Sequence, residues 1–164
     1  MIQLDVDAAI VDLDGTLVDT LGDFAEALNR MLVELGLSVV TVEAIALRVG
    51  KGSEHLIQSI LAHVGADANL YDAAFASYQR HYAQINGQFS ALYPGALQGL
   101  AALRARGLRL VCLTNKPTAL ARPLLEAKGL APFFEQVYGG DAFERKKPDP
   151  LPLLKACEAL GTTP

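Results

Sequence analysis

The sequence predicts an α/β fold, a Rossmann-like core built on a parallel sheet with a helical cap inserted into it. Short apolar runs at residues 8–12, 108–113 and 136–138 indicate buried strands. Helical patterns separate the later strands, as they do where crossovers join parallel strands. Residues 17–92 show helical periodicity, so we expect the insertion to follow the first strand and the short loop that ends at residue 16.

The first half of the chain contains three expected helices. The first covers residues 21–35 and ends at Gly36, the second begins at Ser53, and the third covers about 70–84. Their apolar faces are formed by Phe24, Leu28, Met31, Leu32 and Leu35, by Leu56, Ile57, Ile60 and Leu61, and by Leu70, Phe75, Tyr78 and Tyr82. These helices make up the expected cap, residues 17–92.

At residues 93–95, Tyr-Pro-Gly interrupts the helical pattern. Beyond it, helices and strands alternate: a helix at 96–105, a strand at 108–113, a helix at 118–128, a strand at 136–138 and a helix at about 150–160. We therefore assign residues 1–16 and 93–164 to the core.

Composition narrows the class of protein. A length of 164 residues suits one domain with an insert, and a net charge of −4 argues against nucleic-acid binding. No apolar run is long enough to span a membrane, and the N-terminus does not resemble a signal peptide. Cys112 and Cys157 lie in apolar surroundings, which favours small buried side chains over a disulfide or a metal pair. We expect a cytoplasmic protein; its oligomeric state stays open.

Asp12 and Asp14 stand at the end of the first expected strand, directly before Gly15. Carboxylates at such a place are costly unless they bind a cation or take part in chemistry. Ligands of open α/β sheets bind just beyond the carboxyl ends of the strands. The alternative is an Asp-Gly turn in which an aspartate caps the next helix.

Polar residues also follow the two later strands. Thr114 and Asn115 offer donors that suit phosphate oxygens, or else they cap the helix that follows Pro117. Lys147, which precedes Pro148, can supply a point charge for phosphate, or else it belongs to a solvated basic loop. Acids, a hydroxyl and a lysine at successive strand ends predict phosphoryl transfer to an aspartate.

Three motifs resemble those of the haloacid dehalogenase-like hydrolases: Asp12-Leu-Asp-Gly-Thr16-Leu-Val-Asp, Thr114-Asn-Lys-Pro117 and Lys147-Pro-Asp-Pro150. The resemblance runs along the whole chain and is greatest to the group of bacterial phosphoglycolate phosphatases. That group is suggested by Gly50-Lys51-Gly52, Tyr93-Pro94-Gly95, Gly139-Gly140-Asp141 and Leu28-Asn29-Arg30-Met31-Leu32.

The resemblance implies a Mg²⁺-dependent phosphatase that hydrolyses a small phosphorylated acid such as 2-phosphoglycolate. Asp12 is then the nucleophile and Asp14 the general acid and base. The Asp12 carboxylate and the Asp14 backbone carbonyl are the implied Mg²⁺ ligands, and Thr114, Asn115 and Lys147 hold the phosphoryl group. The resemblance also implies that the cap closes over the site and recognises the substrate.

Lys51 lies between two glycines in an expected loop of the cap. Its ammonium can meet the carboxylate of a small acidic substrate. The alternative is a lysine in a solvated loop.

The resemblance has one gap. The family's fourth motif, an acidic Gly-Asp cluster on a further strand, has no counterpart before Pro164, where only Glu158 follows residue 150. We therefore expect the C-terminal part of the core to be missing, an uncovered apolar edge beside the first strand, and weak activity of the 164-residue chain.

The sequence is compatible with other functions. The same superfamily contains sugar-phosphate phosphatases and phosphosugar mutases, which the cap would distinguish. A haloacid dehalogenase is disfavoured because it needs no acid at the position of Asp14. A receiver-like signalling domain is disfavoured by the long helical insertion, and an inactive fragment or non-enzymatic scaffold is suggested by the absent fourth motif.

Overall fold

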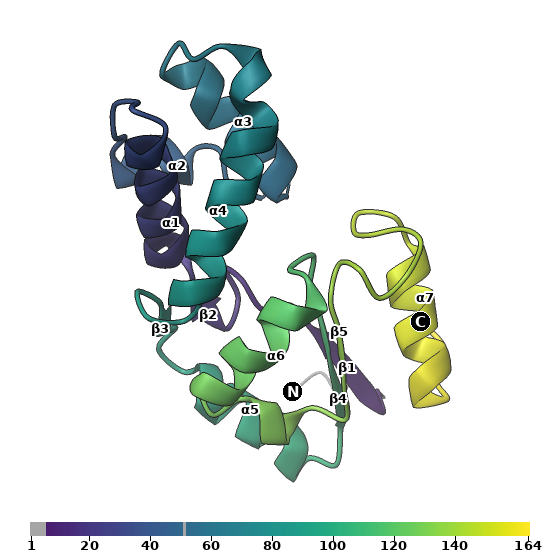
Figure 1. The fold of residues 1–164 in the computed structure, drawn as a ribbon. Helices are drawn as coiled ribbons and strands as arrows, with labels where there is room; N and C mark the ends of the chain where they lie inside the picture. Colours follow the sequence, from purple (N-terminus) through teal and green to yellow (C-terminus); the bar gives the residue numbers. More distant parts are fainter. Residues whose placement is uncertain (1–5, 51) are drawn as a thin grey trace. The chain divides into compact units, whose positions relative to one another are not determined.

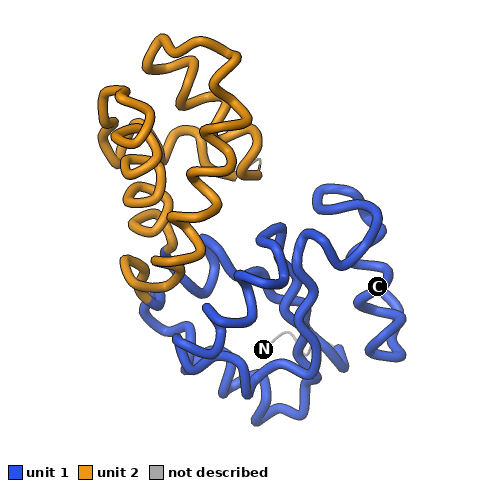
Figure 2. Tube along the Cα trace, in the orientation of Figure 1, with its two compact units in different colours: residues 1–19, 92–164 blue, residues 20–91 orange. Residues whose placement is uncertain are grey.

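The computed structural model describes residues 6–50 and 52–164. The chain forms two compact units, which Figure 2 distinguishes by colour. The first comprises Met1–Asp19 and Leu92–Pro164, and the second comprises Thr20–Ala91. We refer to them as the sheet unit and the helical unit.

A parallel three-stranded sheet forms the centre of the sheet unit (Figure 1). Its order is β1 (Ala8–Val11), β4 (Arg109–Leu113) and β5 (Gln136–Tyr138). Both pairs of neighbouring strands run parallel, with Val11 opposite Cys112 and Cys112 opposite Val137. The α/β fold with a parallel sheet is therefore confirmed.

Three helices pack on the two faces of this sheet: α5 (Ala96–Ala105), α6 (Thr118–Ala127) and α7 (Leu151–Leu160). Alternate residues of β4 face opposite sides. Leu110 and Cys112 pack in a core cluster that includes residues of α5 and α6, whereas Val111 packs with Ala156 and Leu160 of α7. Burial on both faces explains why the β4 sequence is an unbroken apolar run.

Strand β1 lies at the edge of the sheet that the described residues form. Each of its four residues is partly exposed, whereas the last four residues of β4 are buried. Both cysteines are free and buried, which confirms their expected role as small packing side chains.

The helical unit contains α1 (Leu21–Glu34), α2 (Val42–Ala46), α3 (Ser53–His63), the short 3-10 helix η1 (Ala68–Leu70) and α4 (Tyr71–Ile85). A further 3-10 helix, η2 (Ala131–Phe133), precedes β5. Among the described residues, no helix has both the length and the apolar character needed to cross a bilayer.

The expectation that residues 17–92 are wholly helical is wrong at both ends. There, β2 (Val18–Asp19) and β3 (Ala91–Leu92) pair in a two-stranded sheet. Helix α2 was also not expected, because it has five residues and only Ile45 of them is buried. Two-residue strands and single helical turns are too short to show a period in the sequence.

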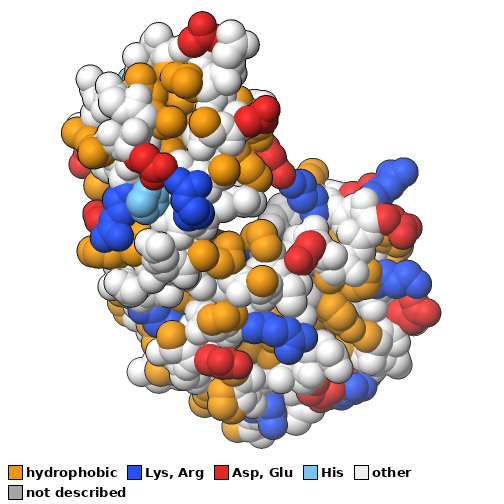
Figure 3. Space-filling model, in the orientation of Figure 1, with side chains coloured by type: hydrophobic (Ala, Val, Ile, Leu, Met, Phe, Trp, Pro, Cys, Tyr) orange, Lys and Arg blue, Asp and Glu red, His pale blue; other side chains and the backbone are white. Residues whose placement is uncertain are grey.

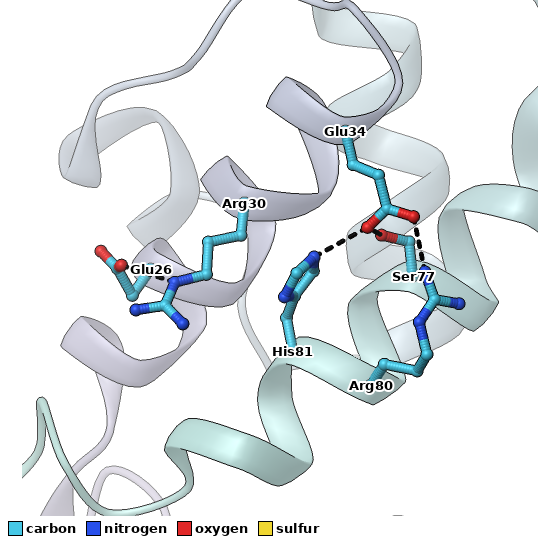
Figure 4. A network of polar contacts seen from close by, with 6 residues as sticks. All are labelled: Glu26, Arg30, Glu34, Ser77, Arg80 and His81. Carbon is cyan, nitrogen blue, oxygen red and sulfur yellow. Dashed lines mark hydrogen bonds and ion pairs between the residues drawn. The ribbon is translucent and has the colours of Figure 1, made fainter.

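A polar network joins α1 to α4 on one face of the helical unit (Figure 4). Glu34 accepts a hydrogen bond from Ser77 Oγ at 2.7 Å and pairs with Arg80 at 2.5 Å and His81 Nε2 at 2.8 Å. Figure 3 shows charged side chains of both signs around a histidine on this face. The hydrogen bonds from Ser77 and His81 lower the pKa of Glu34.

A buried carboxylate fixes the chain that leaves α4. Asp23 of α1 is fully buried, and its two oxygens accept the backbone N–H groups of Gly87 at 2.8 Å and Phe89 at 2.7 Å. A Cβ atom on the adjacent Gly22 would lie 2.1 Å from the Phe89 carbonyl oxygen. Helix α1 and residues 87–89 therefore pack too closely to admit a residue larger than glycine at position 22.

We predict that Asp23→Ala lowers the free energy of unfolding by about 2–6 kcal/mol, because two partly buried N–H groups lose their acceptors at about 1–3 kcal/mol each. Urea denaturation measures the loss. Asp72→Ala, which removes an exposed carboxylate from the first turn of α4, is the matched control and should change stability by about 1 kcal/mol or less. Equal losses in the two variants would contradict the proposed role of Asp23.

Candidate active site

Asp12 and Asp14 lie in a tight turn directly after β1. The Leu13 carbonyl accepts the N–H groups of Leu17 at 3.0 Å and Val18 at 3.1 Å, and Leu13 itself is buried. Gly15 has a φ of 75°, a conformation that favours glycine. Helix α1 begins only at Leu21 and has no side-chain cap, so the alternative of an aspartate that caps the next helix is wrong.

Lys147 reaches the end of β1 from the loop that follows β5. Its Nζ lies 3.0 Å from Asp12 Oδ1 and also donates to the Leu113 carbonyl at the end of β4, at 2.9 Å. Its side chain is 24% exposed. The alternative of a solvated basic loop is therefore wrong for Lys147, although the neighbouring Lys146 is exposed.

Thr114 and Asn115 lie where β4 ends. Thr114 is buried, and its Oγ1 accepts the N–H of Lys116 at 3.1 Å. Asn115 Nδ2 donates to the Lys147 carbonyl at 2.9 Å. The structure thus brings Thr114, Asn115 and Lys147 together with the turn that carries Asp12.

The alternative that Thr114 or Asn115 caps helix α6 is wrong. The N-cap residue of α6 is Pro117, and no side chain of its own caps the helix. The first N–H group, that of Thr118, donates instead to Asp141 Oδ1 at 2.8 Å. Two hydrogen bonds from Thr118 lower the pKa of Asp141, which keeps this acceptor ionised.

Gly139 and Gly140 allow the end of β5 to approach the loop after β4. A Cβ atom on Gly140 would lie 2.3 Å from the Asn115 carbonyl oxygen, and one on Gly139 would lie 2.4 Å from the Thr118 nitrogen. The Gly140 N–H donates to the Lys116 carbonyl at 2.9 Å. The two glycines are therefore required by backbone contact.

Lys116 lies within the predicted motif Thr114-Asn-Lys-Pro117 but was not predicted as a site residue. Its Nζ lies 3.2 Å from Asp14 Oδ1, and its side chain is only 3% exposed. The feature of the sequence that could have indicated a role for Lys116 is its position between Asn115 and Pro117 in this motif. Lysine is seldom buried without a charged partner.

The negative charge of the site acts on a neighbouring thiol. Burial raises the pKa of Cys112 to about 12, and the charges of Asp12 and Asp14 act in the same direction while Lys147 opposes them. The Cys112 thiol is therefore uncharged at neutral pH and is no nucleophile.

The donor set suits a hard cation. The Asp12 side chain is 43% exposed, and Mg²⁺ in phosphoryl-transfer sites is held by one or two carboxylates together with phosphate and water. Within the described part of the chain, no group of three or more His, Cys, Asp or Glu side chains forms a metal site by itself. Lys51, the expected specificity residue, lies outside the described residues.

Comparisons with known proteins agree with this geometry. A family model described as haloacid dehalogenase-like hydrolase matches residues 6–164. The phosphoglycolate phosphatase of Cupriavidus necator is 44% identical over 161 residues, which cover 97% of this chain and 69% of that protein. That of Nitrosospira multiformis is 43% identical over 164 residues, covering 98% of this chain and 72% of that protein.

Solved structures show the same fold. The crystal structure of a protein described as a predicted phosphoglycolate phosphatase of Haemophilus somnus matches with a TM-score of 0.91 and 28% identity. The match covers 98% of this chain and 74% of that one. A haloacid dehalogenase-like family protein of Streptococcus pneumoniae matches with a TM-score of 0.82 at 22% identity, covering 97% and 72%, and supports the fold alone.

We predict that Gly140→Ala destabilises the sheet unit and weakens binding of inorganic phosphate, because the new methyl group would displace the Asn115 carbonyl. Overpacking of this kind costs about 1–3 kcal/mol. Urea denaturation and phosphate titration measure the two effects. Gly99→Ala is the matched control: Gly99 is exposed within α5 with no heavy atom near its Cβ position, so alanine should stabilise by about 0.5–1 kcal/mol. An unchanged free energy of unfolding in Gly140→Ala would contradict the close approach of Gly140 to the Asn115 carbonyl.

Proposed function

Because the chain belongs to the haloacid dehalogenase-like hydrolases, we propose that it is a phosphatase that hydrolyses a small phosphorylated acid, 2-phosphoglycolate, through an aspartyl-phosphate. The observation that carries the proposal is the contact of Asp12 with Lys147 at 3.0 Å, beside Thr114 and Asn115. A carboxylate nucleophile and a fixed cation at one place are what phosphoryl transfer requires.

In the proposed reaction, an oxygen of Asp12 forms a bond to phosphorus while the bond to the ester oxygen breaks. Asp14 gives a proton to the departing oxygen. Asp14 then takes a proton from a water molecule that attacks the aspartyl-phosphate, which releases inorganic phosphate and restores the Asp12 carboxylate. Lys147, Thr114 and Asn115 offset the charge of the phosphoryl oxygens.

The proposed cofactor is Mg²⁺, held by the Asp12 carboxylate and the Asp14 backbone carbonyl. It supplies positive charge next to the phosphoryl oxygens. Mg²⁺ prefers hard oxygen donors of this kind to soft thiolate ligands. The Cys112 thiol near the site stays protonated and therefore offers no thiolate.

The relatives support 2-phosphoglycolate as the substrate, because those at 40–44% identity include several that are named phosphoglycolate phosphatase. We propose that residues 17–92 form the cap that selects this substrate and that Lys51 binds its carboxylate. A sugar-phosphate phosphatase or phosphosugar mutase is the alternative within the family. An inactive fragment or a non-enzymatic scaffold is the alternative without catalytic activity.

Asp12→Asn tests the proposed reaction. The amide keeps the shape of the side chain but is a poor nucleophile, so hydrolysis of 2-phosphoglycolate in the presence of Mg²⁺ should fall by about 10³-fold or more. The control is Asp72→Asn, an exposed change in the helical unit that should leave the rate unaltered. Retained turnover in a folded Asp12→Asn variant would contradict the assignment, and preferential hydrolysis of hexose phosphates by the unmodified chain would favour the sugar-phosphate alternative.

Lys51→Ala tests the proposed specificity residue. A charge-assisted hydrogen bond contributes about 1.5–3 kcal/mol, so the variant should raise KM for 2-phosphoglycolate by about tenfold or more. Ethyl phosphate has a similar size but no carboxylate, and its KM should change little. Lys155→Ala on α7 is the control for loss of a surface lysine. Equal effects on both esters would show that Lys51 does not bind the carboxylate.

A further inference from the structure

The buried ammonium of Lys116 needs an explanation, because the reaction proposed above uses Lys147 but not Lys116. The side chain of Lys116 is 3% exposed, and its Nζ lies 3.2 Å from Asp14 Oδ1. By contrast, the pair between Lys155 and Glu158 lies on the surface, with side chains 48% and 71% exposed. A lysine is held in a buried place at a cost, so its contact with Asp14 points to a function.

Backbone contacts on both sides fix the position of Lys116. Its N–H donates to Thr114 Oγ1 at 3.1 Å, and its carbonyl accepts the N–H of Gly140 at 2.9 Å. A side chain at position 140 would collide with the Asn115 carbonyl, so the end of β5 lies directly against this loop. The loop after β4 therefore presents the Lys116 ammonium at a defined point.

Lys116 engages one oxygen of Asp14. The ion pair is made through Oδ1, and the carboxylate is 22% exposed. The backbone of Asp14 is fixed by a bridge to Val18, which leaves the side-chain torsions as its main freedom. A cation on Oδ1 restricts those torsions and directs the second oxygen, Oδ2.

We propose that Lys116 is a positioning residue that holds Asp14 through Oδ1, so that Oδ2 gives its proton to the leaving oxygen. The inference rests on the proposed function. The two lysines then have separate roles: Lys147 contacts the Asp12 carboxylate, whereas Lys116 contacts Oδ1 of the Asp14 carboxyl group, whose Oδ2 carries the proton in the acid form.

The choice of leaving group tests this role. Lys116→Met replaces the lysine with a side chain of similar length but removes the cation. The quantity measured is kcat/KM, which reports the transfer of the phosphoryl group to Asp12. An alkyl ester such as 2-phosphoglycolate needs a proton on its leaving oxygen, whereas p-nitrophenolate leaves without one. We expect kcat/KM to fall by about 10²-fold for the alkyl ester and by much less for p-nitrophenyl phosphate.

Two further variants separate positioning from other roles. In an Asp14→Asn background, Lys116→Met should cause no further loss, because the proposed effect of Lys116 on the rate is transmitted by Asp14; a further loss would indicate direct contact with the phosphoryl group and overturn the inference. Lys116→Arg keeps the charge and should recover part of the alkyl-ester rate. Lys155→Met, the surface lysine, should leave both rates unchanged.

The outcomes distinguish the two proposals. Equal losses with the alkyl and aryl esters would mean that Lys116 is only structural, which overturns the inference while the proposed function stands. Hydrolysis of both esters at an unchanged rate by a folded Asp12→Asn variant would overturn the proposed function and, with it, the role of Lys116. If Lys116→Met does not fold, the same comparison of esters is made with Lys116→Arg, whose displaced cation should again affect the alkyl ester more.

Discussion

The ion pair between Asp12 and Lys147 is the contact on which the arrangement of the site depends. The same Lys147 ammonium binds the Leu113 carbonyl, so one group links the ends of β1 and β4 to the loop that follows β5. This is possible because the three strands are parallel and end at the same edge of the sheet. Burial of β4 on both faces and the close approach of Gly140 to Asn115 maintain that alignment.

Charge balance is the second constraint. Two carboxylates stand two residues apart, and each faces its own lysine: Asp12 meets Lys147 and Asp14 meets Lys116. The carboxylates still act on their surroundings, since they contribute to the high pKa of the Cys112 thiol beneath them. In the proposed function, cations that are fixed in advance would offset the further negative charge of a phosphate ester.

The sequence predicted the strand ends well, because a buried strand is an uninterrupted apolar run and polar residues after it are conspicuous. It therefore identified Asp12, Thr114, Asn115 and Lys147, which the structure brings together. It assigned no role to Lys116, because a contact between residues 102 positions apart depends on which way a side chain points. The buried Asp23 was missed for a similar reason: its partners are backbone N–H groups, which leave no mark on the sequence.

Direct detection of the intermediate tests the central claim most sharply. Asp14→Asn should slow the water step, so acid quenching during incubation with p-nitrophenyl phosphate and Mg²⁺ should trap a phosphorylated chain. Peptide mapping by mass spectrometry should place one phosphoryl group on Asp12, and Asp12→Asn in the same background should carry none. A phosphoryl group on another residue, or continued hydrolysis with no phosphorylated chain at any time, would contradict the account.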